Sequence, residues 1–283
     1  VSGTSTAEAG QTVTVSLNGK DYTTTVSADG SWTLNVPAAN VAALTDGSVT
    51  VTASVSDKAG NPASVDHNLT VDVTVPAVTI NTVAGDDVIN IAEHSQAHII
   101  SGTATGAAAG DKVTVTIGGQ TYTTVLDAAG NWSVGVPASV ISGLSDGTVT
   151  VTASVTDAAG NTGTGSHNVT VDTGLPSVSF NAISDDNVLN AVEKGQDLSV
   201  SGTSANLAEG TVVTVTLNGK NYTATTAADG TWSLTVPAAD LAGLGQANYT
   251  LNATATNGVG NSVSNTANLL VDTALPTVTI NTV

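Results

Sequence analysis

The carboxylates are the residues of this sequence that are best suited to chemistry. The chain has 23 Asp and Glu residues but only five Lys and Arg residues, so its formal net charge is −18. Carboxylates that lie close together repel one another by about 1 kcal/mol or more per pair, even at a high dielectric constant. Calcium relieves such repulsion, because it takes roughly six to eight oxygen ligands from carboxylates, amides and carbonyls. This composition suits either a highly soluble protein or one that collects divalent cations.

Other catalytic or metal-binding chemistry finds little support in the sequence. Cysteine is absent, which rules out disulfides and thiolate metal sites. The HExxH, CxxC, GxGxxG and P-loop motifs are also absent. No nucleophile lies at a spacing from a base that indicates catalysis, so we predict that the chain is not an enzyme. His67 and His167 occupy equivalent strand positions and are expected to face solvent. The histidines, too few for a zinc site, are His67, His94, His98 and His167.

The negative charge also limits the partners of the chain. Nucleic acids and anionic membrane surfaces attract basic patches, so we expect neither as a partner. No apolar run approaches the roughly 18 residues needed to span a membrane, so no membrane insertion is expected. Methionine and cysteine are both absent, which an extracellular bacterial protein tolerates. Because the sequence does not begin with methionine, we expect it to be a fragment of a longer protein.

A segment around a tryptophan organises the chain. It occurs as DGSWTLNVP, AGNWSVGVP and DGTWSLTVP at a spacing of 100 residues, which indicates a supersecondary unit copied in tandem. In each copy, apolar and polar residues alternate between a turn pair and a proline, as in a half-buried β-strand. We expect Trp32, Trp132 and Trp232 to pack in the cores, since Trp buries a large area. Stacking on a sugar is the alternative role for these side chains.

The second unit contains every part of the repeat and predicts its fold. Short runs rich in Val and Thr alternate with turns, and no helix-like periodicity is present. The connection at residues 138–147 is expected to hold one helical turn. Short strands joined by turns predict an antiparallel β-sandwich of the immunoglobulin (Ig) type. The seven expected strands span residues 76–83, 98–103, 112–117, 120–127, 131–137, 148–156 and 166–172.

The repeats divide the chain into domains. We place Ig-like domains at residues 1–72, 73–172 and 173–272, and the first strand of a following repeat at residues 273–283. The first domain begins at a position equivalent to Ile100, so we expect it to lack the first strand of the fold. The linkers VDVTVP, VDTGLP and VDTALP are short and end in proline, which restricts their bending. The sequence therefore predicts an all-β chain of seven-stranded sandwiches arranged end to end as a rod.

The expected topology gathers acidic residues at both ends of each sandwich. The end of one domain meets the start of the next across a short linker, so acids from both domains meet there. We predict that Ca²⁺ binds at each junction and stiffens the rod, with a second site in loops that carry paired aspartates. The alternative is that these acids are solvated turn residues, because Asp favours turns. The predicted ligands are Asp72 with Asp111, Asp127 and Asp157 at the first junction, Asp172 with Asp229 at the second, Asp146 at the end of the second domain, and Asp86, Asp87, Asp185 and Asp186 in the paired loops.

Four segments of the repeat resemble the bacterial immunoglobulin-like repeats of giant surface adhesins that are exported by type I secretion. They are the DGSWTxxVP strand, the L(S/T)DG connection, the (V/A)TDAAGN turn and the VDTxxP linker. Biofilm-associated proteins and large non-fimbrial adhesins contain such repeats, and the resemblance covers the whole chain. It implies a long stalk that holds a distal binding domain away from the bacterial surface, with calcium at the domain junctions.

The same resemblance assigns the calcium ligands to particular positions. Two residues depart from the pattern, because Asn257 replaces a turn aspartate and Gln246 replaces the aspartate of the L(S/T)DG connection. A complete set of sites around the third domain is therefore in doubt. In addition to the paired-aspartate loops, the matching residues are Asp72, Asp172 and Asp272 in the linkers and Asp57 and Asp157 in the turns.

These observations lead us to expect a structural function. The chain would be a spacer of a secreted bacterial cell-surface adhesin that supports adhesion to host cells or biofilm formation. Its partners would be the neighbouring repeats, while other parts of the protein contact the host-cell surface or the biofilm matrix. One alternative is a glycan- or protein-binding Ig-like module, for which Tyr249 is the one unusual aromatic residue. The other is a set of accessory domains of a secreted polysaccharide-degrading enzyme.

The end of the sequence bears on oligomeric state. We expect a monomer. However, Pro276–Val283 match the first strand at residues 76–83 except at one position, and an unpaired strand edge tends to associate. Pairing of this segment with the incomplete first domain of a second molecule is therefore the alternative.

Overall fold

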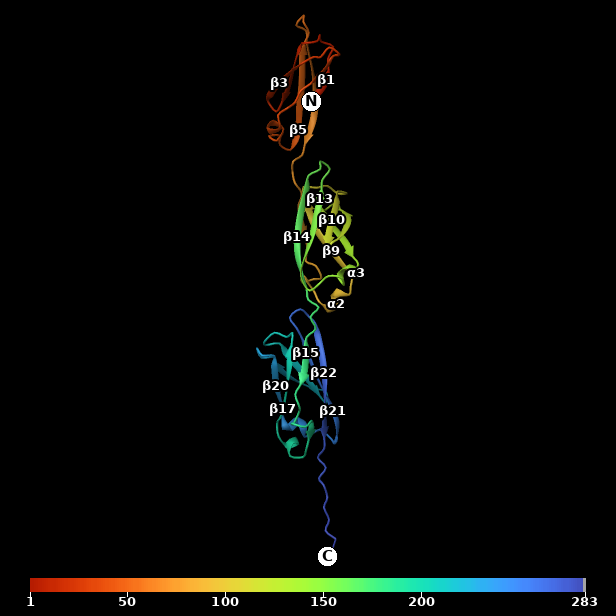
Figure 1. Cartoon of the computed structure of the whole chain (residues 1–283), viewed down its shortest axis with the longest axis vertical. Helices are drawn as coiled ribbons and strands as arrows, with labels where there is room; N and C mark the ends of the chain where they lie inside the picture. The colour runs from red at the N-terminus through yellow and green to blue at the C-terminus, as the bar shows by residue number, and fades with distance from the viewer. Residues whose placement is uncertain (282–283) are drawn as a thin grey trace.

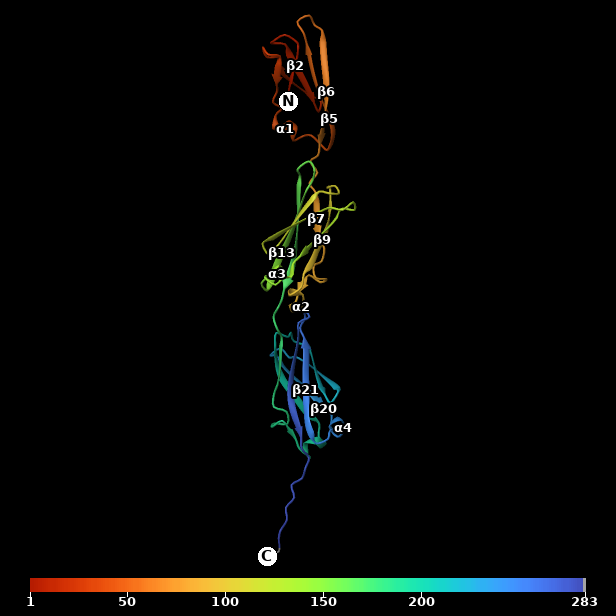
Figure 2. The ribbon, with the colours of Figure 1, turned by 90° about the vertical axis from the view of Figure 1, so that its right-hand side faces the viewer.

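Three β-rich domains follow one another along the chain in a computed structural model that describes residues 1–281. Two perpendicular views show the domains in a row along one axis, and the residues after the third domain extend from its far end (Figure 1, Figure 2). The expected end-to-end arrangement of sandwiches is thus confirmed. The elongated shape means that consecutive domains meet only at their ends.

The second domain is a sandwich of two sheets. Its three-stranded sheet has the order β12-β9-β7, and its five-stranded sheet has the order β11-β10-β13-β14-β8. All seven predicted strands are present, and the pairings among them are antiparallel. The strands are β7 (Ala77–Ile80), β8 (Val88–Ile89), β9 (His98–Thr105), β10 (Lys112–Ile117), β11 (Gln120–Val125), β12 (Asn131–Val136), β13 (Gly147–Thr156) and β14 (Thr162–Val171).

The segment between β7 and β9 contains two short elements that the sequence analysis treats as a loop. The first is β8, an eighth strand that pairs in parallel with β14. The second is the helix α2 (Ile91–His94), whose first turn is held by a capping box. In this box the Asn90 side chain accepts backbone hydrogen bonds from Ala92 and Glu93, and the Glu93 side chain accepts one from Asn90. The capping box fixes the start of α2 at the end of the domain.

The third domain repeats this arrangement, with sheets in the order β15-β17-β20 and β16-β22-β21-β18-β19. A 3₁₀ turn, η1 (Glu193–Gly195), takes the place of α2. A four-residue helix follows the tryptophan strand in each domain, as expected: α1 (Ala38–Val41), α3 (Ala138–Ile141) and α4 (Ala238–Leu241). The strands are β15 (Ser177–Phe180), β16 (Val188–Leu189), β17 (Leu198–Ala205), β18 (Val212–Leu217), β19 (Lys220–Thr225), β20 (Thr231–Val236), β21 (Ala247–Thr256) and β22 (Ser262–Val271).

The first domain has a four-stranded sheet of order β3-β2-β5-β6 and a two-stranded sheet of β1 and β4. Strand β1 corresponds to β9 and β17, which each pair with a strand on both sides. Within residues 1–281, no strand occupies the second edge of β1. The strands are β1 (Ser2–Thr4), β2 (Thr12–Leu17), β3 (Lys20–Thr25), β4 (Ser31–Thr33), β5 (Gly47–Ser56) and β6 (Pro62–Val71).

Each sandwich closes on a core of aliphatic side chains and one tryptophan. Trp32, Trp132 and Trp232 are 7%, 3% and 2% exposed, which confirms their predicted core position. A glycine makes room for each ring. A Cβ atom on Gly102 would lie 2.5 Å from the Trp132 ring and 1.9 Å from the carbonyl oxygen of Thr79 in β7. Only glycine allows both neighbours to approach the backbone this closely.

The segment predicted as the first strand of a following repeat leaves the third domain without a partner strand. Residues 272–281 have no regular secondary structure. Val278 and Ile280 are 92% and 90% exposed, although their equivalents Val78 and Ile80 pack against the core of the second domain. The last two positions of the predicted strand lie outside the described residues.

Candidate functional site at the domain junctions

The turn between the last two strands presents an asparagine to the preceding domain. In the second domain, Asp157 Oδ1 accepts hydrogen bonds from the N–H groups of Ala159 (3.0 Å) and Asn161 (2.8 Å). The Asn161 side chain also donates to Asp157 Oδ2 at 3.0 Å. This side-chain hydrogen bond holds the pKa of Asp157 below its usual value. In the third domain, Asn257 takes the place of the aspartate and accepts from the N–H of Asn261 at 2.9 Å.

The first junction is crossed by the amide of Asn161. Its Nδ2 donates to the backbone carbonyl oxygen of Asp72, in the linker, at 3.1 Å. The linker is itself tied to the first domain, because Asp46 accepts hydrogen bonds from the N–H of Val73 (2.6 Å) and from the Thr74 hydroxyl. The hydrogen bond of Asn161 therefore joins the second domain to a linker that is already bonded to the first domain.

The second junction is more extensive and centres on Asn261, which is only 3% exposed. Its Nδ2 donates to the carbonyl oxygens of Asp172 (2.9 Å) and Gly174 (3.3 Å) in the linker. Its Oδ1 accepts a hydrogen bond from the N–H of Ile91 at 2.8 Å. Ile91 is the first residue of α2, so this amide contacts the body of the second domain as well as the linker. One buried side chain of the third domain is thereby bonded to two separate segments of the second.

The predicted ligand Asp146 acts as an anchor for this linker. Its carboxylate accepts hydrogen bonds from the backbone N–H (2.9 Å) and the hydroxyl (2.7 Å) of Thr173. These bonds, the side-chain one first, hold the pKa of Asp146 below its usual value. In the third domain Gln246 occupies the equivalent position, and its Nε2 lies 3.5 Å from the Thr273 hydroxyl. The amide therefore contacts the linker at the position where the aspartate does so in the other domains.

Three other predicted ligands are engaged within their own turns. Asp111 accepts from the N–H of Ala108 at 2.7 Å. Asp127 accepts from the N–H groups of Ala129 and Asn131, both at 2.8 Å. Within residues 1–281, neither carboxylate bonds to another domain. Asp229 is also engaged within its own turn, because its carboxylate accepts a hydrogen bond from the N–H of Thr231 at 3.0 Å.

The paired-aspartate loops hold their carboxylates apart. Asp86 caps the N–H of Val88 at 3.0 Å. Asp87 adopts a positive φ of 64° and accepts from the N–H of Val83 at 2.8 Å. Asp87 also lies 2.7 Å from Nε2 of His167. In the third domain, Asp186 caps the N–H two residues later at 2.9 Å, and Asp185 has a positive φ of 61°. Asp86, Asp87 and Asp186 thus each hold a local turn of their own loop.

The histidines have structural roles in the second domain. The expectation that His167 faces solvent is wrong, because its side chain is 27% exposed and bonded to Asp87; its equivalent His67 is exposed as expected. His94 and His98 each place Nε2 near a backbone carbonyl oxygen, those of Leu144 (3.0 Å) and Glu93 (2.9 Å). Tyr249, the unusual aromatic residue, has a similar local role, since its hydroxyl accepts from the N–H of Gly245 at 2.8 Å.

The second junction has oxygen donors that fit calcium. No group of three or more acidic or histidine side chains in the described part of the chain comes together as a metal cluster. Asp172 and Glu93 nevertheless belong to segments that meet beside the linker, because the N–H of Asp172 bonds to the carbonyl oxygen of Ile89, next to the Asn90 cap. Carboxylate, amide and carbonyl oxygens in one place are the ligands that Ca²⁺ accepts. The metal ligands listed from sequence stay a prediction.

The asparagines that cross the junctions are not among the residues to which the charge pattern points. A signal for them is present, because Asn61, Asn161 and Asn261 recur in all three turns while the aspartate at the start of the turn becomes Asn257 in the third. No comparable signal marks Ile91, since its N–H becomes a partner only when two domains dock.

The fold and its junctions define the class of protein, a tandem array of Ig-like β-sandwiches. The bacterial Ig-like domain family matches residues 1–73, 74–173 and 181–273. The chain therefore belongs to the bacterial Ig-like domain family. No curated protein matches the chain. No helix within residues 1–281 is long and apolar enough to cross a membrane.

Three solved structures extend this comparison to large adhesins. One concerns host cell surface retention of a 1.5-MDa bacterial ice-binding adhesin; it is 33% identical, has a TM-score of 0.51, and covers 96% of this chain and 90% of its own. A Ca²⁺-stabilised adhesin with which an Antarctic bacterium binds ice is 40% identical, with a TM-score of 0.49 and coverage of 96% and 68%. A tetra-tandem repeat from the extending region of a large adhesion protein is 31% identical, with a TM-score of 0.39 and coverage of 96% and 70%. The chain is thus similar to the Ig-like repeat region of a large bacterial adhesin.

Proposed function

We propose that this chain is a stiff spacer in the stalk of a secreted bacterial surface adhesin. The observation that carries the proposal is the buried amide of Asn261, which bonds the third domain to both the linker and α2 of the second. The relative that concerns cell-surface retention of a giant adhesin supports a location at the bacterial surface. Export would use type I secretion, and other parts of the protein would contact a host cell or a biofilm matrix.

The hydrogen bonds of Asn261 explain how the second and third domains can keep a fixed angle between their long axes. An amide offers a donor and an acceptor at once, and only one orientation satisfies the carbonyls of Asp172 and Gly174 together with the N–H of Ile91. Bending at the linker would break these bonds together. A buried polar group that loses its partner costs about 1–3 kcal/mol, so bent conformers would be minor.

Calcium is the second source of stiffness in this proposal. Asp172 and Glu93 would hold the ion beside the linker carbonyls, and the ion would supply a cross-link between the end of one domain and the start of the next. The remaining predicted ligands would then act as turn and linker anchors. This division of roles predicts that Ca²⁺ adds to a junction that the asparagine already forms.

The flexibility of the second junction tests the spacer function. The chain has no cysteine, so spin labels can be placed on Thr123→Cys and Thr223→Cys, two exposed and equivalent strand positions. We expect a narrow label-to-label distance distribution, measured by pulsed electron paramagnetic resonance. Asn261→Ala should broaden this distribution. The matched control is Asn61→Ala, which changes the same turn in the first domain and should leave the distance unchanged.

The same distance measurement, repeated with a calcium chelator, tests the contribution of calcium. Chelation should broaden the distribution further in the Asn261→Ala variant, because the ion is then the remaining cross-link. If Asn261→Ala has the same narrow distribution as the parent in chelator, the asparagine does not stiffen the junction. A distribution that is already broad in the parent, with and without calcium, would contradict the spacer function itself.

A further inference from the structure

The segment from Pro76 to Ile89 is bonded to both sheets of the second domain. Its first part, β7, pairs antiparallel with β9 in the three-stranded sheet. Its second part, β8, pairs in parallel with the end of β14 in the five-stranded sheet. We call this segment, residues 76–89, the entry segment of the domain. It ties the linker from the preceding domain to both layers of the sandwich.

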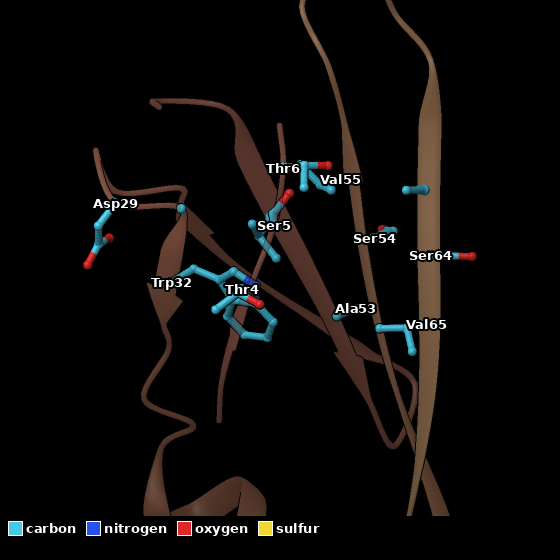
Figure 3. Close-up of a pocket in the computed structure, with 13 residues that line it drawn as sticks. Thr4, Ser5, Thr6, Asp29, Trp32, Ala53, Ser54, Val55, Ser64 and Val65 are labelled. Atoms are coloured by element: carbon cyan, nitrogen blue, oxygen red, sulfur yellow. The ribbon is translucent and has the colours of Figure 1, made fainter. Parts of the chain in front are cut away.

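The entry segment is set into the gap between the two sheets. The first domain shows the surface that lies beneath such a segment, a groove of about 380 Å³ whose lining includes Trp32, Val55 and Val65 (Figure 3). In the second domain β7 occupies the equivalent place. There, a Cβ atom added to Gly163 of β14 would lie 1.7 Å from the carbonyl oxygen of Pro76. The start of the entry segment is therefore packed closely against the backbone of β14.

Hydrogen bonds and buried side chains hold β8 in place. The N–H of Thr170 donates to the carbonyl oxygen of Asp87 at 2.8 Å. The N–H of Asp172 donates to the carbonyl oxygen of Ile89 at 3.0 Å. Ile89 is fully buried, and Val83, just before β8, is 1% exposed. Pulling β8 out of the sandwich would break these hydrogen bonds and expose both apolar side chains to water.

The direction of the strands determines how they carry tension. The linkers join the second domain at Pro76 and Asp172, at opposite ends of the domain (Figure 1). Because β8 and β14 are parallel, tension on the two linkers pulls these strands past each other along their lengths. Interstrand hydrogen bonds run roughly across the strands. Sliding therefore loads all the bonds of the pair together, whereas peeling would break them one at a time.

We propose that the entry segment and the last strand of each domain form a clamp that bears tension along the chain. In the third domain the clamp consists of residues 176–189 and β22, through the same two pairings of β15 and β16. This load-bearing function goes beyond that of a spacer, because a rod that resists bending can still unfold when it is pulled. Forced unfolding is governed by the rate of unfolding, so the contacts that break first set the force.

One side-chain contact crosses the clamp in each of these two domains, at different places. In the second domain, Nε2 of His167 on β14 lies 2.7 Å from Oδ1 of Asp87, the residue before β8. In the third domain, Nδ2 of Asn265 on β22 donates to the carbonyl oxygen of Val178 in β15 at 2.8 Å. The equivalents of His167 and Asn265 in the other domain are an alanine and a glycine, which cannot form these bonds. Each contact can therefore be removed from one domain without changing the other.

Single-molecule pulling on the two ends of the whole chain, in chelator so that calcium does not contribute, tests the clamp. Each unfolding event lengthens the chain by roughly 3.3–3.6 Å for every residue released. The chain has no cysteine, so Val88→Cys with Thr170→Cys can form a single disulfide between paired residues of β8 and β14. The residues inside this loop are then shielded from the force, and the event that is lost upon oxidation belongs to the second domain. Val188→Cys with Leu270→Cys identifies the third domain in the same way.

Two variants then weaken one clamp each. His167→Ala should lower the unfolding force of the second domain only, and Asn265→Ala should lower that of the third domain only. Each variant is the matched control for the other. His67→Ala removes the equivalent, exposed histidine of the first domain and should change neither force.

A further variant separates the clamp from general stability. Ile117→Ala removes a fully buried side chain from β10, two strands away from β14 in the same sheet. It should lower the Tm of the second domain at least as much as His167→Ala, but lower the unfolding force less, because contacts that are intact in the transition state do not change the unfolding rate. If His167→Ala or Asn265→Ala leaves the force of its own domain unchanged, or if the loss of force follows the loss of Tm in all three variants, the proposal is overturned. The clamp lies within a domain, so this result is independent of the stiffness of the junction.

Discussion

At the scale of single residues, the side chains that cross the junctions are amides in a chain with a net charge of −18. A carboxylate in the place of Asn261 would point its charge at the carbonyl oxygens of Asp172 and Gly174. The amide instead donates to these oxygens and accepts from the N–H of Ile91. It therefore satisfies a buried polar site without burying a charge. The aspartates instead accept hydrogen bonds within the turns and linkers and hold these segments in position.

The turn aspartates predict a dependence of stability on acid. In the folded state, the side-chain hydrogen bond from Asn161 holds the pKa of Asp157 below its usual value of 3.8. Its stabilising effect is therefore present above pH 3.8 and is lost as the pH falls through the lower, folded-state pKa. Asp157→Asn recreates the pair found at Asn257 and Asn261, which does not titrate. The difference in Tm between this variant and the parent should be constant at neutral pH and shrink below about pH 3.8. A difference that stays the same at every pH would contradict this role for Asp157.

At the scale of secondary structure, an equivalent glycine lets neighbouring strands of one sheet approach closely in each complete sandwich. Gly102 lies in β9, between the Trp132 ring and β7. Because β7 and β15 are short, their position depends on this close approach and on the pairing with β9 and β17. The helix α2 is equally short, and its capping box presents the N–H of Ile91 to the next domain. Local backbone geometry thus determines where the long-range contacts form.

Two glycine substitutions test this account of the sheet. Gly102→Ala places a Cβ atom 1.9 Å from the carbonyl oxygen of Thr79, so we expect overpacking to destabilise the second domain by about 1–3 kcal/mol. Gly135→Ala is the matched control in the neighbouring strand β12, where an added Cβ meets nothing within 4 Å. Thermal unfolding of the two variants should show a clear loss of Tm for the first and little change for the second. Equal effects would show that the close approach does not matter.

At the scale of the whole molecule, the three domains differ in how completely their cores are covered. The buried core of the first domain comprises eight residues, against 17 in the second and 19 in the third. Leu69 is 40% exposed in the first domain, whereas its equivalents Val169 and Leu269 are fully buried. The free energy of unfolding follows the apolar area removed from water. Of these three domains, the first is therefore expected to be the least stable.

Calorimetry should detect this inequality as a separate transition of the first domain at a lower temperature than the other two. Limited proteolysis near that temperature should cleave within residues 1–72 and leave residues 73–272 intact. Adding residues 73–99 in front of Val1 should raise the temperature of this first transition, because the added segment contains the equivalent of β7, which can pair with β1 as β7 pairs with β9. A single cooperative transition for the whole chain would contradict the prediction.

The calcium proposal also makes a prediction at this scale. An ion that binds only the folded chain stabilises it, by about 2.7 kcal/mol when its concentration is 100 times the dissociation constant. Asp172→Asn should remove most of the calcium-dependent rise in Tm that is assigned to the second junction. Asp272→Asn changes the equivalent linker position after the third domain and should have a smaller effect. Calorimetry with and without calcium measures this rise in Tm. If both variants lose the same part of the rise, the result would argue against a site at the junction.

The sequence by itself determined the fold of each domain. Alternation with a period of two, turn residues and the repeated tryptophan segment identify seven strands, a buried Trp and domains joined end to end, because these features depend on local spacing. The eighth strand, β8, escaped prediction because two residues carry no periodicity, and its parallel partner lies about 80 residues away, as the pairing of Val88 with Thr170 shows.

Only the tertiary structure decided which residues join the domains. Asn261 and Ile91 are 170 positions apart, and Asn161 lies 89 positions from Asp72. Counting charges at the ends of the sandwiches favoured the aspartates, but most of these carboxylates are bonded within their own turns and linkers. A hydrogen bond across a junction depends on how two folded surfaces dock. That geometry is a property of the assembled domains, and no local pattern of residues encodes it.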